Sequence, residues 1–270
     1  MKPIAESGFE SEVKSLSRTE WRQGVITSAT DLVIEETPVA LVYNGISHVV
    51  MMVTPCDLED FALGFSLSEG ILASAVELLD FEIVREDKGL ELRLTVVNQR
   101  FEMLKQRRRN LTGRTGCGLC GAESLAQAIV TPQPVQAGYQ LNHEAIDRAI
   151  GQLKQHQRIQ QATGAAHAAA WCDRAGTIVL LREDVGRHNA LDKLLGARER
   201  LGSDEPGFVL ITSRASYEMV VKSARLNIGV LVAVSAPTAL AIGMANDCNI
   251  TLVGFTEPGR HVLYSGELAG

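Results

Sequence analysis

Two cysteines three residues apart, Cys117 and Cys120, have the spacing for redox, metal-binding or sulfur-transfer chemistry. They lie in a glycine-rich stretch, LTGRTGCGLCGAESL, with Arg114 just before them and three more arginines at residues 107–109. A cysteine reacts as its thiolate, which nearby arginines and helix N-termini favour, and a helix is expected to begin right after Cys120. The stretch therefore favours a reactive thiolate. Carrying sulfur as a persulfide is one task for it, although the spacing alone does not separate this from redox sensing.

Zinc binding and thioredoxin-like chemistry fit the same two cysteines less well. A structural zinc site needs about four ligands, and the remaining cysteines, Cys56, Cys172 and Cys248, are isolated and mostly in apolar runs. A thioredoxin-like pair would follow an apolar strand, whereas the preceding letters are RRRNLTGRTG. We therefore expect no structural metal, and we keep a thiol redox or zinc-binding regulator as an alternative function.

The composition indicates a globular protein that binds no nucleic acid. The chain has 270 residues, 26 basic against 32 acidic, and a formal net charge of −6, whereas nucleic-acid-binding domains are usually basic. The first 21 residues contain no apolar core of a secretory signal, and no apolar run approaches the roughly 20 residues of a membrane helix. Five cysteines is an odd number for a disulfide framework. These features predict a cytoplasmic location and no membrane association.

The elements that must position the thiols divide the chain into two α/β parts. We expect a flexible arm over residues 1–20, an N-terminal α+β region over 21–135 with the CxxC loop at 111–121, and a C-terminal domain over 136–270, joined by a linker with two prolines. The N-terminal region is predicted to contain a hairpin turning at Asn44-Gly45, a helix capped by Asp57, a second hairpin over 81–97 and helices over 98–110 and 121–130.

The C-terminal part alternates apolar strands with helices. After a long polar helix over 142–163 and a hairpin over 166–184, the pattern predicts helices over 187–201, 216–227 and 238–248 between strands over 208–214, 229–237 and 250–255. Such alternation is typical of a largely parallel sheet covered on both faces.

Ligands bind such sheets beyond the carboxyl ends of the strands. There this chain places arginines, a histidine and hydroxyls, together with helix N-termini, which suit phosphate. Arginine adds bidentate contacts. Composition and order thus predict a site for a phosphorylated, nucleotide-like ligand, while helix capping and covering of the sheet edge remain the alternative roles. The candidate residues are Arg187, His188, Ser213, Arg214, Thr238, Phe255 and Arg260.

Five blocks in the same order resemble the formate dehydrogenase accessory sulfurtransferase family, FdhD. The blocks are GRTGCGLCG, REDVGRHNALDK, TSRASYEMVVKSA, SAPTALAI and ITLVGF. The resemblance implies that sulfur passes from a cysteine desulfurase to the molybdenum bis(molybdopterin guanine dinucleotide) cofactor of formate dehydrogenase. It also implies a homodimer and a cytidine-deaminase-like C-terminal domain.

Carried onto this chain, the resemblance makes Cys117 the persulfide bearer and Cys120 its companion. Its cofactor-binding stretch corresponds to Phe255, Thr256, Glu257, Pro258, Gly259 and Arg260. Glu257 and Pro258 stand where a basic or polar run is expected, so Arg260 is the expected phosphate partner. A zinc deaminase also needs a glutamate and a Pro-Cys-x-x-Cys, but Ala190 occupies the glutamate position. We expect no hydrolytic zinc site, and a non-catalytic cofactor chaperone remains a further alternative.

Overall fold

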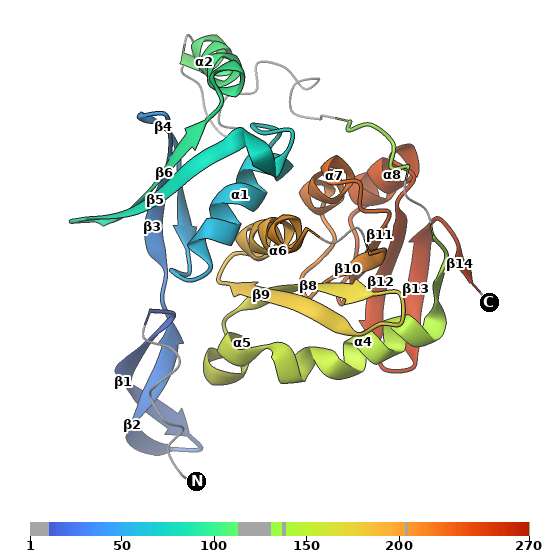
Figure 1. The fold of residues 1–270 in the computed structure, drawn as a ribbon. Helices are drawn as coiled ribbons and strands as arrows, with labels where there is room; N and C mark the ends of the chain where they lie inside the picture. Colours follow the sequence, from blue (N-terminus) through green and yellow to red (C-terminus); the bar gives the residue numbers. More distant parts are fainter. Residues whose placement is uncertain (1–10, 113–130, 137–138, 203–204, 270) are drawn as a thin grey trace.

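A computed structural model describes residues 11–112, 131–136, 139–202 and 205–269 (Figure 1). The described residues form a four-stranded sheet, a six-stranded sheet and two two-stranded pairs. The four-stranded sheet has one hydrophobic core, and the six-stranded sheet has one on each face. The four-stranded sheet and its helix α1 (Leu58–Ser68) lie beside the six-stranded sheet, and helix α6 (Arg187–Leu201) packs between them (Figure 1).

The smaller sheet has four strands in the order β4-β3-β6-β5. The hairpin predicted at Asn44-Gly45 is confirmed, because both residues have positive φ and Tyr43 pairs with Ile46. The second hairpin is also confirmed. Helix α1 fills the core with Phe61. The elements are β3 (Thr37–Tyr43), β4 (Ile46–Val53), α1 (Leu58–Ser68), η1 (Ala75–Glu77), β5 (Leu78–Glu86), β6 (Gly89–Val96) and α2 (Asn98–Thr112).

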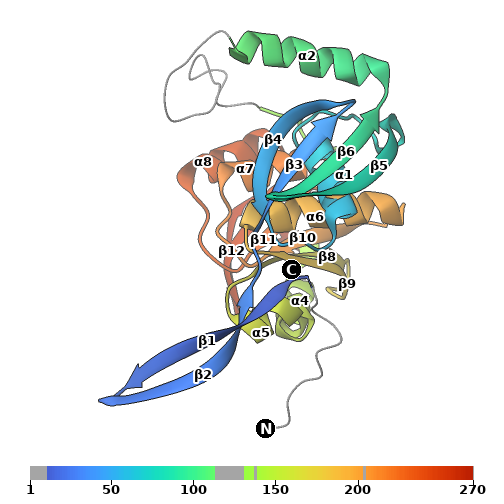
Figure 2. The same ribbon diagram turned by 90° about the vertical axis from the view of Figure 1, so that its left-hand side faces the viewer.

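Two expectations for this region were wrong. From Val13 on, the expected flexible arm is a strand: β1 (Val13–Arg22) pairs antiparallel with β2 (Val25–Ile34), and the resulting ribbon projects from the body (Figure 2). Although the side chains of β1 are mostly polar, its backbone N–H and C=O groups form hydrogen bonds with β2. This pairing stabilises the segment as a strand. Asp57 does precede α1, but it has a left-handed conformation with φ 51° and its side chain makes no cap hydrogen bond.

The larger sheet has six strands in the order β13-β12-β11-β10-β8-β9, and it is mixed instead of largely parallel. Only the β10–β11 and β11–β12 pairs are parallel. The predicted β8–β9 hairpin exists, but β8 inserts antiparallel beside β10, and an unpredicted β13 adds an antiparallel edge. The strands are β8 (His167–Asp173), β9 (Ile178–Asp184), β10 (Gly207–Ile211), β11 (Val230–Ala233), β12 (Thr251–Glu257) and β13 (Arg260–Ser265).

Helices cover both faces of this sheet, as the alternation predicted. On one face α6 (Arg187–Leu201), α7 (Tyr217–Arg225) and α8 (Ala239–Asp247) pack on alternate strand residues. On the other face lies α4 (His143–His156), followed by α5 (Arg158–Thr163); the single long helix predicted here breaks at Gln157, where ψ is 76°. A short pair, β7 (Leu141–Asn142) with β14 (Leu268–Ala269), ties α4 to the C-terminal end.

The two parts meet where α1 crosses α6 at two glycines. A Cβ on Gly64 would lie 1.8 Å from the backbone oxygen of Asp192, and one on Gly196 would lie 1.9 Å from that of Asp60. Since no side chain fits there, the helices touch backbone to backbone. Arg182 on β9 adds hydrogen bonds of 2.7–2.8 Å to Asp60 on α1. This contact fixes the smaller sheet against the larger one.

Candidate functional site

The two thiols that carry the sequence prediction, Cys117 and Cys120, lie outside the described residues, as does the helix predicted at 121–130. The other cysteines suit a nucleophilic role poorly. Cys172 and Cys248 are buried. Burial raises the pKa of Cys172 and raises that of the half-buried Cys56 to about 12, against a smaller lowering effect of Lys193. Both therefore stay protonated near neutral pH, and a neutral thiol is a poor nucleophile.

The strand ends gather at one edge as predicted, even though the sheet is mixed. Strand β8 runs antiparallel to both β9 and β10, so β9 points the same way as β10. Strands β11 and β12 continue parallel to β10. The carboxyl ends of β9, β10, β11 and β12, together with the N-termini of α6, α7 and α8, thus lie at one edge, which we call the carboxyl edge.

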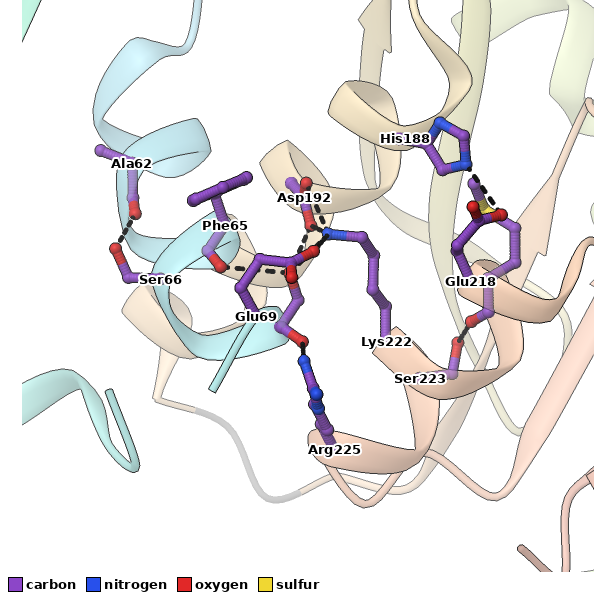
Figure 3. Close-up of polar contacts among 12 residues, drawn as sticks. Ala62, Phe65, Ser66, Glu69, His188, Asp192, Glu218, Lys222, Ser223 and Arg225 are labelled. Carbon is purple, nitrogen blue, oxygen red and sulfur yellow. Dashed lines mark hydrogen bonds and ion pairs between the residues drawn. The ribbon is translucent and has the colours of Figure 1, made fainter. Parts of the chain in front are cut away.

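At one end of the carboxyl edge His188 pairs with a residue that the sequence analysis did not single out, Glu218. The imidazole Nε2 lies 3.3 Å from Glu218 Oε2 (Figure 3). The Ser216 hydroxyl donates to the same oxygen at 2.9 Å. Burial lowers the pKa of His188 and Arg187 lowers it further, while Glu218 acts in the opposite direction. The Nε of Arg187 is buried without a hydrogen-bond partner in the described ranges. These side chains form a polar group that is only partly satisfied internally.

The loop after β10 presents Arg214 at the surface. Ser213 is buried and its hydroxyl donates to the Arg214 carbonyl at 3.0 Å, so its role is structural. Arg214 itself is exposed. The next residue, Ala215, bridges to Pro237 in the loop after β11. In turn, the amide of Phe255 donates to Ser235 at 3.2 Å. The three strand-end loops therefore form one continuous surface.

In the stretch from Phe255 to Arg260, one side chain is buried and makes a structural contact, and others are exposed at the surface. Thr256 is buried, and its hydroxyl donates to Ala233 at 2.9 Å, which is a structural contact. Phe255 is 42% exposed with φ 49°. A left-handed conformation is costly for an aromatic residue and recurs at functional sites. Glu257, the departure noted in the sequence, forms an ion pair with Arg260 at 3.0 Å. Both side chains are largely exposed, so the pair is weak and a bound anion can compete for Arg260.

Behind the carboxyl edge, the motif blocks hold a buried ionic network. Lys193 pairs with Asp184 at 2.7 Å, and both side chains are fully buried. Lys222 contacts Asp192 and Glu69 at 2.8 Å each (Figure 3). Burial alone would lower the pKa of Lys222, but the two carboxylates raise it above its ordinary value. Lys222 thus holds α1, α6 and α7 together, whereas Lys193 joins α6 to β9 and to the segment after β4. Neither lysine is exposed to a ligand.

Within the described ranges, no three His, Cys, Asp or Glu side chains cluster in a way that could hold a metal ion. Every helix of that part of the chain is too short or too polar to span a bilayer.

Known proteins resemble this chain in both sequence and fold. Residues 34–269 match the model of the FdhD/NarQ family. The sulfur carrier protein FdhD of Cupriavidus necator is 55% identical over 246 residues, which cover 91% of this chain and 85% of that protein. A crystal structure from Desulfotalea psychrophila, described as a candidate formate dehydrogenase accessory protein, superposes with a TM-score of 0.73. That match has 24% identity and covers 94% of this chain and 97% of that one, so it supports the fold.

Proposed function

Because this chain belongs to the FdhD/NarQ family, we propose that it is a sulfurtransferase that carries sulfur for formate dehydrogenase. In this proposal a cytoplasmic homodimer accepts sulfur from a cysteine desulfurase. It passes the sulfur to the molybdenum bis(molybdopterin guanine dinucleotide) cofactor, which is bound as a substrate. The observation that carries the proposal is the 55% identity to a sulfur carrier protein over 91% of the chain.

We assign the sulfur to Cys117, with Cys120 as a second thiol that resolves or relays it. The Cys117 thiolate takes the terminal sulfur of the donor persulfide and becomes a persulfide itself. Cleavage of that S–S bond would return the Cys117 thiolate and pass on the terminal sulfur at the oxidation level of elemental sulfur. A reduced metal centre of the cofactor would supply the two electrons that convert this sulfur into a sulfide ligand. The raised pKa values of Cys56 and Cys172 support this assignment, because they leave these two thiols unsuited to nucleophilic attack.

The carboxyl edge is the surface that we propose for the cofactor. Helix N-termini and arginines bind phosphate well, and this edge combines three helix N-termini with Arg187 and Arg214. The exposed Phe255 adds an aromatic ring on which a base could stack. The guanine-dinucleotide ends of the cofactor offer both phosphates and bases.

Intact-mass analysis after incubation with a cysteine desulfurase and cysteine tests the proposal. The wild-type protein should gain one sulfur, ~32 Da, that a reductant removes, as expected of a persulfide. Cys117→Ala should lose this adduct and fail to activate formate dehydrogenase, whereas the matched control Cys172→Ala should keep both properties. Full loading of Cys117→Ala would exclude Cys117 as the carrier. Activation by an unloaded Cys117→Ala protein would instead favour a cofactor chaperone.

A further inference from the structure

A carboxylate–imidazole pair, His188 with Glu218, lies at the carboxyl edge and has no role in carrying the sulfur. The two side chains point toward one another from the first turns of α6 and α7, with 3.3 Å between Nε2 and Oε2 (Figure 3). The His188 side chain is 32% exposed and that of Glu218 is 55% exposed. A ligand bound along the carboxyl edge can therefore reach both of them.

The geometry of this pair is that of a proton-transfer unit. A carboxylate that holds an imidazole orients the ring and stabilises its protonated form, while the other ring nitrogen exchanges a proton with a substrate. Here Nε2 faces Glu218, so Nδ1 is the nitrogen left for exchange. The Ser216 hydroxyl in turn donates to the carboxylate at 2.9 Å and fixes its position. The chain thus supplies an acid–base group and two residues that position it.

Several charges around the ring set its affinity for a proton. Burial lowers the pKa of His188 most, Arg187 lowers it further, and Glu218 opposes both. The groups from the surrounding elements are Arg187 on α6, Glu218 and Lys222 on α7, His167 at the start of β8 and Asp184 at the end of β9, opposite His167. The protonated ring is therefore a stronger acid than an ordinary imidazolium, and Glu218 limits this effect.

The proposed sulfur transfer requires such an acid at one point. Water bound to a metal loses a proton readily, so a metal centre in contact with water carries a hydroxide that an incoming sulfide must displace. Hydroxide leaves readily only as water. The proposed nucleotide stretch ends β12, and the end of β10, from which α7 follows, is two strands away, or about 10 Å at ordinary strand spacing. A cofactor whose nucleotide lies at β12 can thus extend its metal centre toward His188.

We propose that His188 is the general acid of the sulfur-transfer step and that Glu218 and Ser216 are its positioning residues. In this step the S–S bond of the Cys117 persulfide breaks, and its electron pair remains with the Cys117 thiolate. The terminal sulfur forms a bond to the metal, which is oxidised by two electrons as the sulfur becomes sulfide. The imidazolium of His188 gives its proton to the hydroxide ligand, the metal–oxygen bond breaks, and water leaves. The inference rests on the proposed function and adds a catalytic residue to it.

Single-turnover transfer by the full chain tests this assignment. Each variant is first loaded with sulfur to the same ~32 Da adduct and is then mixed with excess sulfur-free cofactor and formate dehydrogenase that lacks cofactor. Loss of the adduct by intact mass and gain of formate dehydrogenase activity are followed in time. His188→Gln should load as the wild type does, but its transfer rate at saturating cofactor should fall about 100-fold or more, as for other lost general acids. Its half-saturating cofactor concentration should stay near the wild-type value.

The pH profile separates proton transfer from a structural role. The protonated ring is the active form, so the transfer rate should fall as the pH rises through the pKa of His188. In Glu218→Gln the charge that supports the proton is lost, so this decline should move to lower pH. It should be absent in His188→Gln. A pairing that only joins α6 to α7 would change stability but not the position of this decline.

His156→Gln is the matched control, since His156 is exposed in the last turn of α4, on the opposite face of the sheet. It should load and transfer sulfur as the wild type does. A wild-type transfer rate in His188→Gln, or a change in its half-saturating concentration alone, would overturn the general-acid role and leave the proposed function intact. If His188→Gln does not fold, an unchanged pH profile in Glu218→Gln would overturn it equally. A wild-type protein that accepts no sulfur on Cys117 would instead overturn the proposed function.

Discussion

The junction of α1, α6 and α7 and the carboxyl edge are both rich in charged residues, but they use charge in opposite ways. At the junction, Lys222 and Asp192 have side chains that are 7% and 1% exposed, and each charge meets a counter-charge. At the carboxyl edge Arg214 is exposed, and Arg260 has only an exposed partner. Charge in the first region is structural, whereas charge in the second remains available to a ligand.

The energetic reason lies in the cost of removing a charge from water. A buried ion must be paired, and loss of its partner leaves an uncompensated charge in the interior. An exposed ion pair contributes little to stability and exchanges partners readily. The same residue types therefore give rigidity at the junction and binding capacity at the edge.

The largest expected effect is at the junction. Lys222→Met leaves the buried Asp192 carboxylate without its cation, so the free energy of unfolding should fall by about 3–5 kcal/mol. Denaturant unfolding monitored by circular dichroism measures it. The double variant Lys222→Met/Asp192→Leu should recover part of the loss, because an apolar pair of similar volume replaces the ionic one. If the free energy of unfolding of Lys222→Met fell by less than about 1 kcal/mol, the Lys222–Asp192 pair would contribute no more than an exposed surface pair.

The sequence predicted individual helices and turns well, because the residue pattern that specifies each of them lies within that element. Helix α6 has the bounds expected from the pattern RHNALDKLLGARERL, and the Asn44-Gly45 turn formed as its residue types required. The gathering of strand ends was also predictable, since β9, β10 and β11 are each followed by a helix on the same face. The pairing of strands that lie far apart in the sequence was not predictable. The position of β8 beside β10 depends on residues about 40 positions apart, which no periodicity reveals.

The candidate site was predictable only in part, for a related reason. The motif lysines Lys193 and Lys222 gave no sign in the sequence of being buried, because their partners are supplied by other elements. Glu218 is an ordinary helix residue in the sequence, and only folding brings it to His188. Ser213 and Thr256 had the expected position but proved to satisfy backbone carbonyls.

A smaller effect is expected at the carboxyl edge, where the charged side chains are exposed. Arg214→Ala should weaken GDP binding about tenfold, because a charged hydrogen bond to phosphate contributes roughly 1.5–3 kcal/mol. Its unfolding free energy should remain within about 0.5 kcal/mol of wild type, as for most surface substitutions. Titration calorimetry and denaturant unfolding on the same samples separate the two properties. Wild-type GDP affinity in this variant would mean that Arg214 only covers the sheet end.

The smallest effect concerns His188, which lies at one end of the carboxyl edge and is part buried. Burial and Arg187 hold its pKa below the usual 6.5, and Glu218 partly offsets them. Glu218→Gln removes that offset, so the pKa of His188 should fall further, as NMR titration of its ring protons would measure. Because the folded pKa is below the unfolded one, the associated stability is present above pH 6.5 and declines as the pH falls toward the folded value. This acid-side decline should therefore be larger in Glu218→Gln than in the wild type. A rise in the pKa of His188 in Glu218→Gln would contradict the pairing of His188 with Glu218. His188 would then belong with the junction residues, whose hydrogen-bond partners lie inside the protein.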